Sequence, residues 1–405
     1  MALTQAGLLE SIVNTFNRVI VTTILVFPIG ILISWLITRT DLPGKEYLDF
    51  FMWLAFFLPT LPILMGWILL LEPDFGLVNQ IIASWFGLEK GPFNIYSFWS
   101  IVWAHIVIRG VAAIYIFLTP AFKNLDSSYE EASRISGRST IGTLLRIVVP
   151  VMTPAILITL IISLIHSLES FEIERVLGGP TGFFVFSTKI YELISETHPQ
   201  FGAATVLSII ILLVMLPLIL FQQYFNSRKK FTTVTSHFKR NIVRLRTMKW
   251  PAFIFVFGFC FFVTVVPIVF MVMGTFMNLF GFFDIEQVWT LDHWKRVLKD
   301  PILINSLWNT IKLGISAALI GMVLYTLLAY ISVRSKYVGR GIIDFLTWVP
   351  NAIPGIILGL GLLWMFLGNT VLRPLYGTIF ILIIAVLINL NIKLPQQTIH
   401  MRTFV

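Results

Sequence analysis

Charge is scarce in this sequence: Asp, Glu, Lys and Arg make up 12% of its 405 residues, against roughly 25% in a typical soluble globular chain. Hydrophobic residues make up 57%, and the mean hydropathy is +0.88. A compact fold of this size would leave a large surface that so few polar residues could not cover. The shortage of charge therefore excludes a soluble globular protein and predicts a chain surrounded by lipid.

Cysteine and the common catalytic patterns are also missing. The single cysteine, Cys260, rules out an intramolecular disulfide and a thiolate metal site. The other five histidines besides His166, namely His105, His198, His237, His293 and His400, show no metal-ligand spacing, and we interpret them, like Arg109, as background. The sequence contains no GxxxxGK(S/T) phosphate loop, and no Ser-His-Asp or carboxylate-pair arrangement in it suggests covalent or acid-base chemistry. We therefore expect no enzyme activity, no cofactor bound by this chain and no metal site.

Long apolar runs are what the sequence has in abundance. A hydrocarbon core about 30 Å thick is crossed by roughly 20 apolar residues of helix. About nine runs approach or exceed this length, so the sequence predicts an all-α, polytopic membrane protein. The predicted spans are 13–38, 50–71, 97–120, 151–168, 201–224, 251–277, 305–332, 342–366 and 375–391.

Basic residues indicate which loops face the cytoplasm. The connector 225–249 carries eight Lys and Arg residues and no acidic residue, which predicts a cytoplasmic loop over anionic headgroups. Nucleic-acid binding is the other interpretation of such a cluster, but apolar runs flank it and no aromatic-basic pattern accompanies it. The N-terminus is then outside, the C-terminus inside, and only loop 39–50 does not support the scheme. The remaining loops follow, with 121–150, 333–341 and 392–405 inside and 170–200 outside.

The two halves of the sequence resemble each other. An Asp-Phe-x-x-Trp run occurs at 49–53 and again at 344–348, in the same direction, so the repeat is parallel rather than inverted. A pair of prolines follows each run, and we expect helices that are kinked or interrupted near the translocation path at these prolines. The pairs are Pro59 with Pro62 and Pro350 with Pro354.

The repeat predicts two lobes. The first covers 1–224 and contains loop 121–150, a basic linker covers 225–249, and the second lobe covers 250–405. The span at 251–277 has no counterpart in the first lobe, and the second lobe stops where its own copy of loop 121–150 would begin. We therefore expect the chain to be incomplete at both ends, as a window on a longer tandem protein or a degenerate copy of one.

The loop after the third predicted span carries the most specific motif. It reads Tyr129-Glu130-Glu131-Ala132-Ser133-Arg134-Ile135-Ser136-Gly137, then nine residues, then Ile147-Val148-Val149-Pro150. This resembles the EAA loop of binding-protein-dependent ABC transporter permeases, whose pattern is Glu-Ala-Ala, three residues, Gly, nine residues and Ile-x-Leu-Pro. The spacing matches without a gap, with Ser133 in place of the second Ala and Val149 in place of the Leu.

The residues of this loop predict two short helices at a turn. Glu130 and Glu131 favour the first turn of a helix over 127–136, and Gly137 permits a turn without a Cβ penalty. A second short helix follows, with an apolar face, and Pro150 stands at the entry to the next span. The alternative is a solvated loop that merely joins two spans. The resemblance implies instead that the loop docks on a cytoplasmic ATPase, through Glu130, Glu131, Ala132, Ser133, Gly137, Ile147 and Pro150.

A second group of ionisable residues lies near the outer end of the fourth predicted span. His166 and Glu169 share a helix face, with Glu172 or Glu174 nearby. They predict a cation-attracting vestibule on the translocation path, or alternatively a set of interfacial charges that reach the headgroups. Pro59 and Pro350 complete the candidate path.

The resemblance implies a permease component of an ATP-driven ABC importer of type I architecture in the bacterial inner membrane. Such a chain takes a solute from an extracytoplasmic binding protein, while separate ATPase subunits use the ATP. Fused two-lobe permeases of this appearance most resemble the ferric iron type, so ferric iron is the expected solute, with thiamine, polyamine or phosphonate as alternatives. A truncated, non-functional fragment remains a competing interpretation, because one coupling loop cannot engage both ATPases of a pair. A membrane enzyme or sensor is disfavoured.

Overall fold

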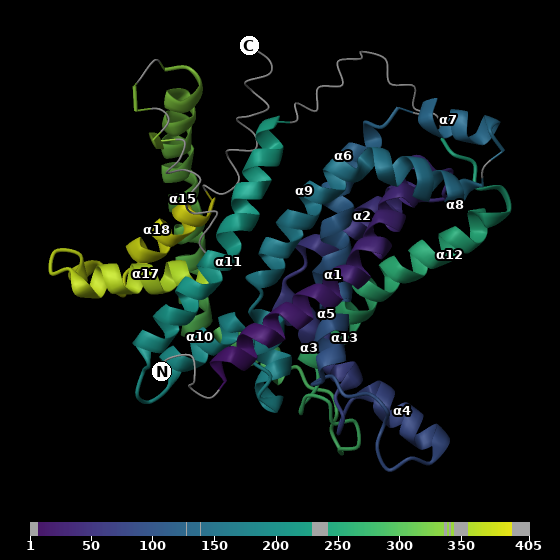
Figure 1. The fold of residues 1–405 in the computed structure, drawn as a ribbon. Helices are drawn as coiled ribbons and strands as arrows, with labels where there is room; N and C mark the ends of the chain where they lie inside the picture. The colour runs from purple at the N-terminus through teal and green to yellow at the C-terminus, as the bar shows by residue number, and fades with distance from the viewer. Residues whose placement is uncertain are drawn as a thin grey trace. The chain divides into compact units, whose positions relative to one another are not determined.

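The computed structural model describes residues 7–126, 128–137, 139–228, 242–335, 338–339, 342–343 and 355–390. These residues are almost entirely helical (Figure 1). Only two isolated β-bridges occur among them, and no strand or sheet. The predicted all-α class is confirmed.

The chain forms two compact units, Met1–Lys189 with Leu220–Leu291, and Ile190–Ile219 with Asp292–Val405. Helices α10 (Phe186–Ser195) and α11 (Phe201–Arg228) contribute to both. The first unit contains α1 (Leu8–Arg39), α2 (Lys45–Phe57), α3 (Thr60–Leu71), α4 (Leu77–Phe86), α5 (Phe98–His105), α6 (Val111–Lys123), α7 (Ser128–Ile135), α8 (Thr140–Thr143), α9 (Val149–Leu168), α12 (Lys249–Cys260) and α13 (Val266–Thr275). The second contains α14 (Asp292–Lys299), α15 (Pro301–Val333), α17 (Gly355–Gly368) and α18 (Ile379–Leu390).

Six helical runs of the described residues are long and apolar enough to cross a membrane. They correspond to six of the nine predicted spans. The last two predicted spans are represented by α17 and α18, which have 14 and 12 residues. Parts of both predictions, including Pro350, lie outside the described residues. The six runs are Leu8–Arg39, Phe98–Lys123, Ile141–Leu168, Phe201–Gln222, Arg246–Thr275 and Pro301–Ile331.

The remaining predicted span, 50–71, is a broken helix. Helices α2 and α3 meet at an angle of 99° across the short break that contains Pro59. Leu58 is extended, with φ −61° and ψ 134°, as expected for a residue that precedes proline. Pro59 and Pro62 both fall in or beside the first turn of α3, where a missing N–H removes no helical hydrogen bond. The predicted interruption at Pro59 is confirmed, while its place on a translocation path stays a prediction.

The core of the first unit forms around α1, which packs against α5, α6 and α9. Gly30 permits the close approach of α1 to α6, because a Cβ at this position would lie 2.6 Å from Ile114 Cβ. Small residues at such crossings let helices approach in a lipid environment that offers little hydrophobic driving force. Trp35, Trp67 and Tyr115 are among the largest fully buried side chains of this core.

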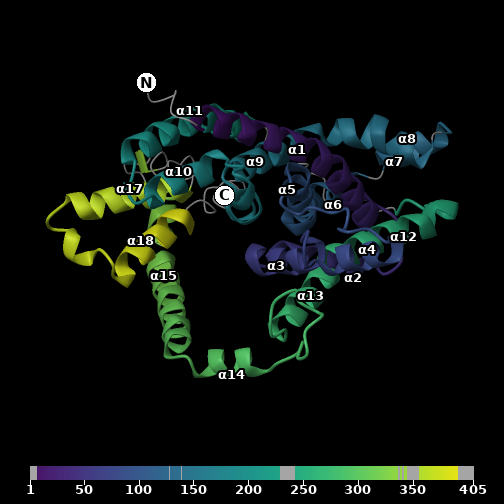
Figure 2. The same ribbon diagram turned by 90° about the horizontal axis from the view of Figure 1, so that it is seen from below.

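Helix α13 packs along α3, and α12 packs against α2 (Figure 2). A Cβ on Gly66 of α3 would lie 2.3 Å from the carbonyl oxygen of Pro267, so only glycine allows this approach. The predicted second lobe starts at residue 250, yet the compact unit groups Leu220–Leu291 with the first part of the chain. The lobes of the sequence repeat and the compact units therefore have different boundaries, and the lobe assignment stays a prediction.

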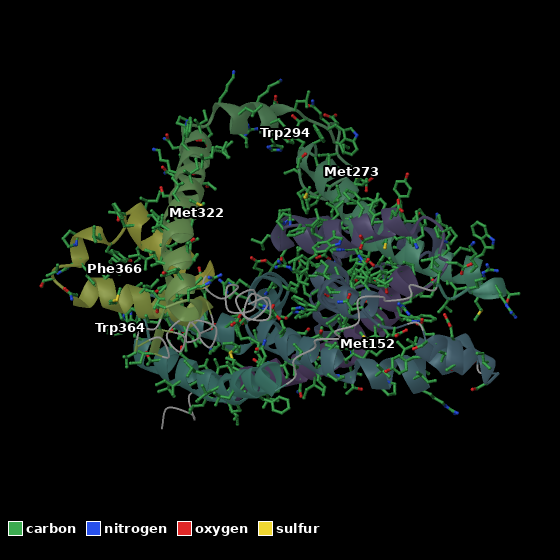
Figure 3. The ribbon with its side chains drawn as sticks, turned by 90° about the horizontal axis from the view of Figure 1, so that it is seen from above. Met152, Met273, Trp294, Met322, Trp364 and Phe366 are labelled. Atoms are coloured by element: carbon green, nitrogen blue, oxygen red, sulfur yellow. The ribbon has the colours of Figure 1, made fainter. Side chains whose placement is uncertain are left out.

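The second unit is built from α15, α17 and α18, with α18 contacting both of the others. The ring of Trp364 on α17 lies 5.7 Å from that of Phe201, and Phe366 is buried (Figure 3). Much of α15 is exposed apolar surface. Such a surface is expected for helices that face lipid.

Candidate functional site

The loop between α6 and α9 forms the two predicted helices around a turn. Helix α7 covers Ser128–Ile135 with Glu130 and Glu131 in its first turn, and α8 begins at Thr140. Gly137 lies between them with φ 75°, a left-handed conformation that strains any residue with a Cβ. Figure 1 shows α7 and α8 beyond the end of α6. The predicted pair of helices and the turn at Gly137 are confirmed.

The second helix of this loop differs from the prediction in one respect. It does not end before the fourth span but continues into it, because Ile141–Leu168 is one helical run of 28 residues. Ile147 lies in a π-helical turn, η3 (Leu144–Val148), and Pro150 lies in the first turn of α9. The missing N–H of Pro150 leaves a carbonyl of the preceding turn without its usual donor, and a π-helical turn is a common local adjustment of this kind. A movement of α8 therefore acts directly on a membrane span.

A buried ion pair joins α7 to the end of α1. Arg39 Nη2 lies 2.5 Å from Glu130 Oε2, and Arg39 Nε donates to Glu130 Oε1 at 3.3 Å. Arg39 Nη1 also donates to the carbonyl oxygen of Leu125 at 2.9 Å. Both charged side chains are buried, and the paired geometry of guanidinium and carboxylate makes such contacts strong and directional. The first span and the loop are thus tied together by their charges.

The same end of α1 is tied to residues that follow the basic linker. The amide N–H of Val243 donates to the carbonyl oxygen of Arg39 at 2.8 Å, and the N–H of Asp41 donates to the Val243 carbonyl oxygen at 3.1 Å. Asp41 Oδ1 accepts from the N–H of Leu245 at 2.8 Å. Residues 39–41 therefore contact both α7 and the segment that leads into α12.

A side-chain hydrogen bond closes the turn between α7 and α8. Ser133 Oγ lies 2.9 Å from Thr143 Oγ1, and both residues are buried. A buried hydroxyl without a partner would be unfavourable. Thr143 thus explains how a serine fits where the related motif has alanine. Ala132 is exposed, Ile147 half-buried and Pro150 exposed, so the predicted site residues divide between the inner and outer faces of the loop.

Replacing Gly137 with alanine should destabilise the turn by about 1 kcal/mol, because an L-residue with a Cβ pays roughly 1–2 kcal/mol in the left-handed region. Space is not the cause, since a Cβ at Gly137 would meet nothing within 4 Å. Gly179→Ala is the matched control, because its Cβ would also meet nothing within 4 Å and its φ of −52° is ordinary. Thermal unfolding in detergent measures both, and equal melting temperatures for the two variants would contradict the argument.

A second buried cluster lies within the first unit around Glu174. Arg18 Nε lies 3.0 Å from Glu174 Oε1, and His105 Nε2 lies 2.7 Å from the same oxygen. Ser170 Oγ donates to Glu174 Oε2 at 2.7 Å. Arg18 also donates to the hydroxyl and the carbonyl oxygen of Ser167, at 2.5 and 2.6 Å. The side chains of Arg18 and Glu174 are fully buried, so each charge depends on these partners.

The pKa of Glu174 reflects this environment. Burial alone would raise the pKa, but the charges of Arg18 and His105 and the hydrogen bonds from His105 and Ser170 lower it, from 4.5 to about 2. Glu174 lies outside the helical runs that are long enough to cross a membrane. It therefore holds the loop after α9 against α1 and α5 as a carboxylate.

The predicted vestibule is not gathered into one site. His166 Nδ1 and Glu169 Oε2 are 3.8 Å apart on α9 and its end, with the His166 side chain largely exposed. Glu172 is exposed, whereas Glu174 points into the buried cluster with Arg18 and His105. Across the described residues no group of three or more His, Cys, Asp or Glu side chains could hold a metal ion. A role of His166 and Glu169 on the translocation path stays a prediction.

Sequence reasoning missed the partners of the key charges. Loop 39–50, which begins at Arg39, entered only as the loop that does not support the orientation scheme, and no sequence feature joined Arg18 or His105 to Glu174. Arg39 and Glu130 are 91 positions apart, so no local spacing joins them. One usable signal was present: an arginine at the last turn of a span and an acidic residue in a loop on the same predicted side of the membrane.

Comparison with protein families matches residues 27–231 to the family described as binding-protein-dependent transport system inner membrane component. The matched segment makes up half of the chain and contains α7, α8 and the buried Arg39–Glu130 pair. The chain belongs to this family. As a member whose described residues include six apolar runs long enough to cross a bilayer, it is a multi-pass protein of the inner membrane.

Individual relatives of this family differ in solute. The chain is 27% identical over 327 residues to the ferric transport system permease protein FbpB of Actinobacillus pleuropneumoniae, covering 76% of this chain and 44% of that protein. It is 31% identical over 207 residues to a probable sulfate transport system permease protein, cysT, of Prototheca wickerhamii, covering 49% of this chain and 77% of that protein. The chain spans about half the length of the ferric-type curated relatives that it matches.

A solved structure is similar over part of the chain. It is a chain in the crystal structure of a bacterial alginate ABC transporter in complex with an alginate pentasaccharide-bound periplasmic protein. The identity is 24%, the TM-score is 0.49, and the match covers 56% of this chain and 80% of that one.

Proposed function

We propose that this protein is a membrane component of an ATP-driven importer, and that its α7–α8 loop docks on a cytoplasmic ATPase subunit. The importer takes its solute from an extracytoplasmic binding protein, and the ATPase subunit, not this chain, binds and hydrolyses ATP. The family assignment supports the class of transporter. The observation that carries the docking surface is the exposure of several apolar side chains on the loop itself.

Four apolar side chains are exposed on α7, on α8 and at the start of η3. Ile135 is 88% exposed, and Tyr129, Ile141 and Leu145 are also exposed. Leu144 and Val148, which follow in the same helical run, are instead buried in the core. The loop therefore has an inner face anchored on the spans and an outer apolar face. Exposed apolar side chains on a loop predicted to lie in the cytoplasm favour a protein partner.

The buried Arg39–Glu130 pair supports a mechanical role for this loop. A solvated loop that merely joined two spans would need no buried ion pair with α1. With the pair in place, a displacement of α7 acts on α1 through Arg39 and on α9 through α8. Closure of the ATPase would thus be passed to at least two membrane spans.

The solute proposed is ferric iron, on the basis of the ferric permease relatives. The sulfate permease relative favours an oxyanion as the alternative. Uptake of radiolabelled ferric iron and sulfate by the complete transporter, purified from its native membrane and reconstituted in lipid vesicles, separates the two. ATP-dependent accumulation of sulfate without accumulation of iron would contradict the iron assignment.

The docking surface is tested with a double variant, Ile135→Ser with Ile141→Ser, in a tagged chain purified from its native membrane. Both side chains are exposed, so the fold should tolerate the changes. Each removes an apolar contact of about 1 kcal/mol or more from the interface, and tenfold in affinity corresponds to about 1.4 kcal/mol. We expect recovery of the ATPase subunit to fall at least about tenfold.

The matched control is Trp85→Ser with Leu88→Ser, which alters two exposed apolar side chains on the predicted outer side. Recovery of the ATPase with this control should equal that of the unmodified chain. Equal recovery with the Ile135 and Ile141 variant, or no ATPase with any chain, would argue against the proposed function.

A further inference from the structure

Arg109 is a charged residue in the middle of a predicted membrane span. It lies in η2 (Ile106–Gly110), a π-helical turn between α5 and α6. The span Phe98–Lys123 has 26 residues, and at about 1.5 Å of rise per residue more than about 15 Å of helix separates Arg109 from either end. Since the hydrocarbon core is about 30 Å thick, Arg109 lies near its middle.

Lipid alone is a poor surrounding for this side chain. A charged group at the centre of a bilayer is strongly disfavoured unless it faces a water-filled cavity or a counter-charge. Arg109 is nevertheless exposed on the first unit, and within the described part of the chain it has no carboxylate partner. Two carboxylates of the first unit are engaged by other residues, Glu174 by Arg18 and His105, and Asp49 by the hydroxyl of Tyr115.

The surroundings of Arg109 are those of a broken helix. Turn η2 packs against both α2 and α3, the two helices that meet at 99°. The Arg109 guanidinium lies 5.0 Å from the centre of the Phe56 ring, a cation–π contact that holds the side chain beside the break. Phe57 follows, with its ring 5.3 Å from that of Phe56 and 70% exposed.

Interrupted helices inside a membrane are tolerated where they are buried in protein or line a water-filled cavity, and π-helical turns are frequent at functional sites. Here one of each lies side by side, with a positive charge that lacks a protein counter-charge among the described residues. We propose that Arg109 lines the translocation path beside the α2–α3 break and recognises an anionic solute. The solute class is an oxyanion such as sulfate or molybdate, or a metal chelate with exposed carboxylates. Planar guanidinium donors suit such oxygen acceptors.

This inference rests on the proposed importer function and narrows its solute. A bare cation would be repelled at Arg109, so iron would pass only as an anionic complex. The proposal assigns a role to a residue whose sequence context suggested none, and it does not depend on the His166 and Glu169 pair.

The test measures the electrostatic potential beside Arg109 in the complete transporter. Cys260, the only cysteine of the sequence, is buried, and Cys260→Ala gives a background for labelling. In that background Phe57→Cys is reacted with two water-soluble methanethiosulfonates, one carrying a sulfonate and one a quaternary ammonium group. The ratio of the two rates reports the local charge. Because both reagents react with the same thiol, a change in the accessibility of that thiol alters both rates alike and cancels in the ratio.

We expect Phe57→Cys to react with both reagents. When Arg109→Gln is added, the rate with the sulfonate reagent divided by the rate with the ammonium reagent should fall at least about threefold. The reason is that removal of one positive charge about 10 Å away slows the anionic reagent and speeds the cationic one. Arg109→Lys should keep most of the ratio, and Lys90→Gln, which removes an exposed charge outside the spans, should leave it unchanged. Sulfate, molybdate and ferric citrate are then added separately, and the anion that slows the sulfonate reagent at the lowest concentration identifies the solute source.

Two results would overturn the proposal. One is a rate ratio that does not change with Arg109→Gln. The other is a Phe57→Cys that reacts as slowly as Ile24→Cys, an exposed position in the middle of α1, because Phe57 would then face lipid. Recovery of the ATPase subunit with each variant is measured alongside. Retained ATPase with an unchanged ratio refutes the role of Arg109 while leaving the proposed function in place.

Discussion

Replacing Glu130 with alanine should destabilise the protein by about 3–5 kcal/mol, the range for removing one member of a buried ion pair. The reason is that Arg39 would stay buried with its charge uncompensated, because its remaining partner is the Leu125 carbonyl oxygen. Thermal unfolding in detergent, followed by the loss of helical circular dichroism, measures the change. The same variant should lose ATP-driven transport even at temperatures where it remains folded, because α7 would no longer be held to α1.

Two variants separate this effect from general damage. Glu46→Ala removes an exposed carboxylate in the first turn of α2 and should change stability by less than about 1 kcal/mol. Arg39→Leu together with Glu130→Leu removes both charges and should recover much of the loss, because apolar replacement of a buried pair is often close to neutral. If Glu130→Ala has the same melting temperature as Glu46→Ala, the buried ion pair does not hold the loop.

Replacing Glu174 with leucine should cost about 3–5 kcal/mol as well, because it leaves the fully buried Arg18 without its carboxylate. The loop after α9 would also lose its contacts to His105 and Ser170. Glu172→Leu is the matched control, since Glu172 is exposed two positions earlier. Unfolding of the two variants in the same detergent decides the matter, and a Glu174 variant as stable as the Glu172 variant would refute the assignment.

The lowered pKa of Glu174 adds a dependence on pH. Its pKa falls from 4.5 to about 2 on folding, so the unfolded chain takes up this proton first as the solution becomes acidic. The stabilisation is complete above the ordinary pKa and is lost as the pH falls from 4.5 towards 2. Between these values the unmodified chain should lose more stability than Glu174→Gln, which cannot titrate. Parallel curves for the two chains would show that Glu174 is not a buried carboxylate.

Local features of the fold could be read from the sequence. The turn at Gly137, the two helices beside it and the break at Pro59 follow from short-range constraints: a left-handed glycine, acidic residues in a first turn, and a proline that forces its neighbour into an extended conformation. The apolar runs likewise gave the six long spans. Such features depend on residues within a few positions of one another.

Contacts across the chain could not be read in this way. Arg39 meets Glu130 and Arg18 meets Glu174 only because α1 packs against α5, α6 and α9, and no spacing in the sequence encodes those contacts. The packing of α12 and α13 on α2 and α3 could not be predicted either. The sequence repeat shows which segments have similar residues, and this does not say which helices are in contact in the folded chain. A role for the charge of Arg109 could be inferred only from its position beside the break between α2 and α3.

Docking of the ATPase subunit on the outer face of the α7–α8 loop is the core of the proposed function. Photo-crosslinking from position 135 in the native membrane tests it most directly, because the Ile135 side chain is 88% exposed and the probe disturbs no buried contact. A benzophenone amino acid at position 135 should crosslink to a subunit that binds ATP, identified by mass spectrometry, while the same probe at position 85 should not. Crosslinks from position 135 to lipid alone, or none to an ATP-binding protein, would contradict the account.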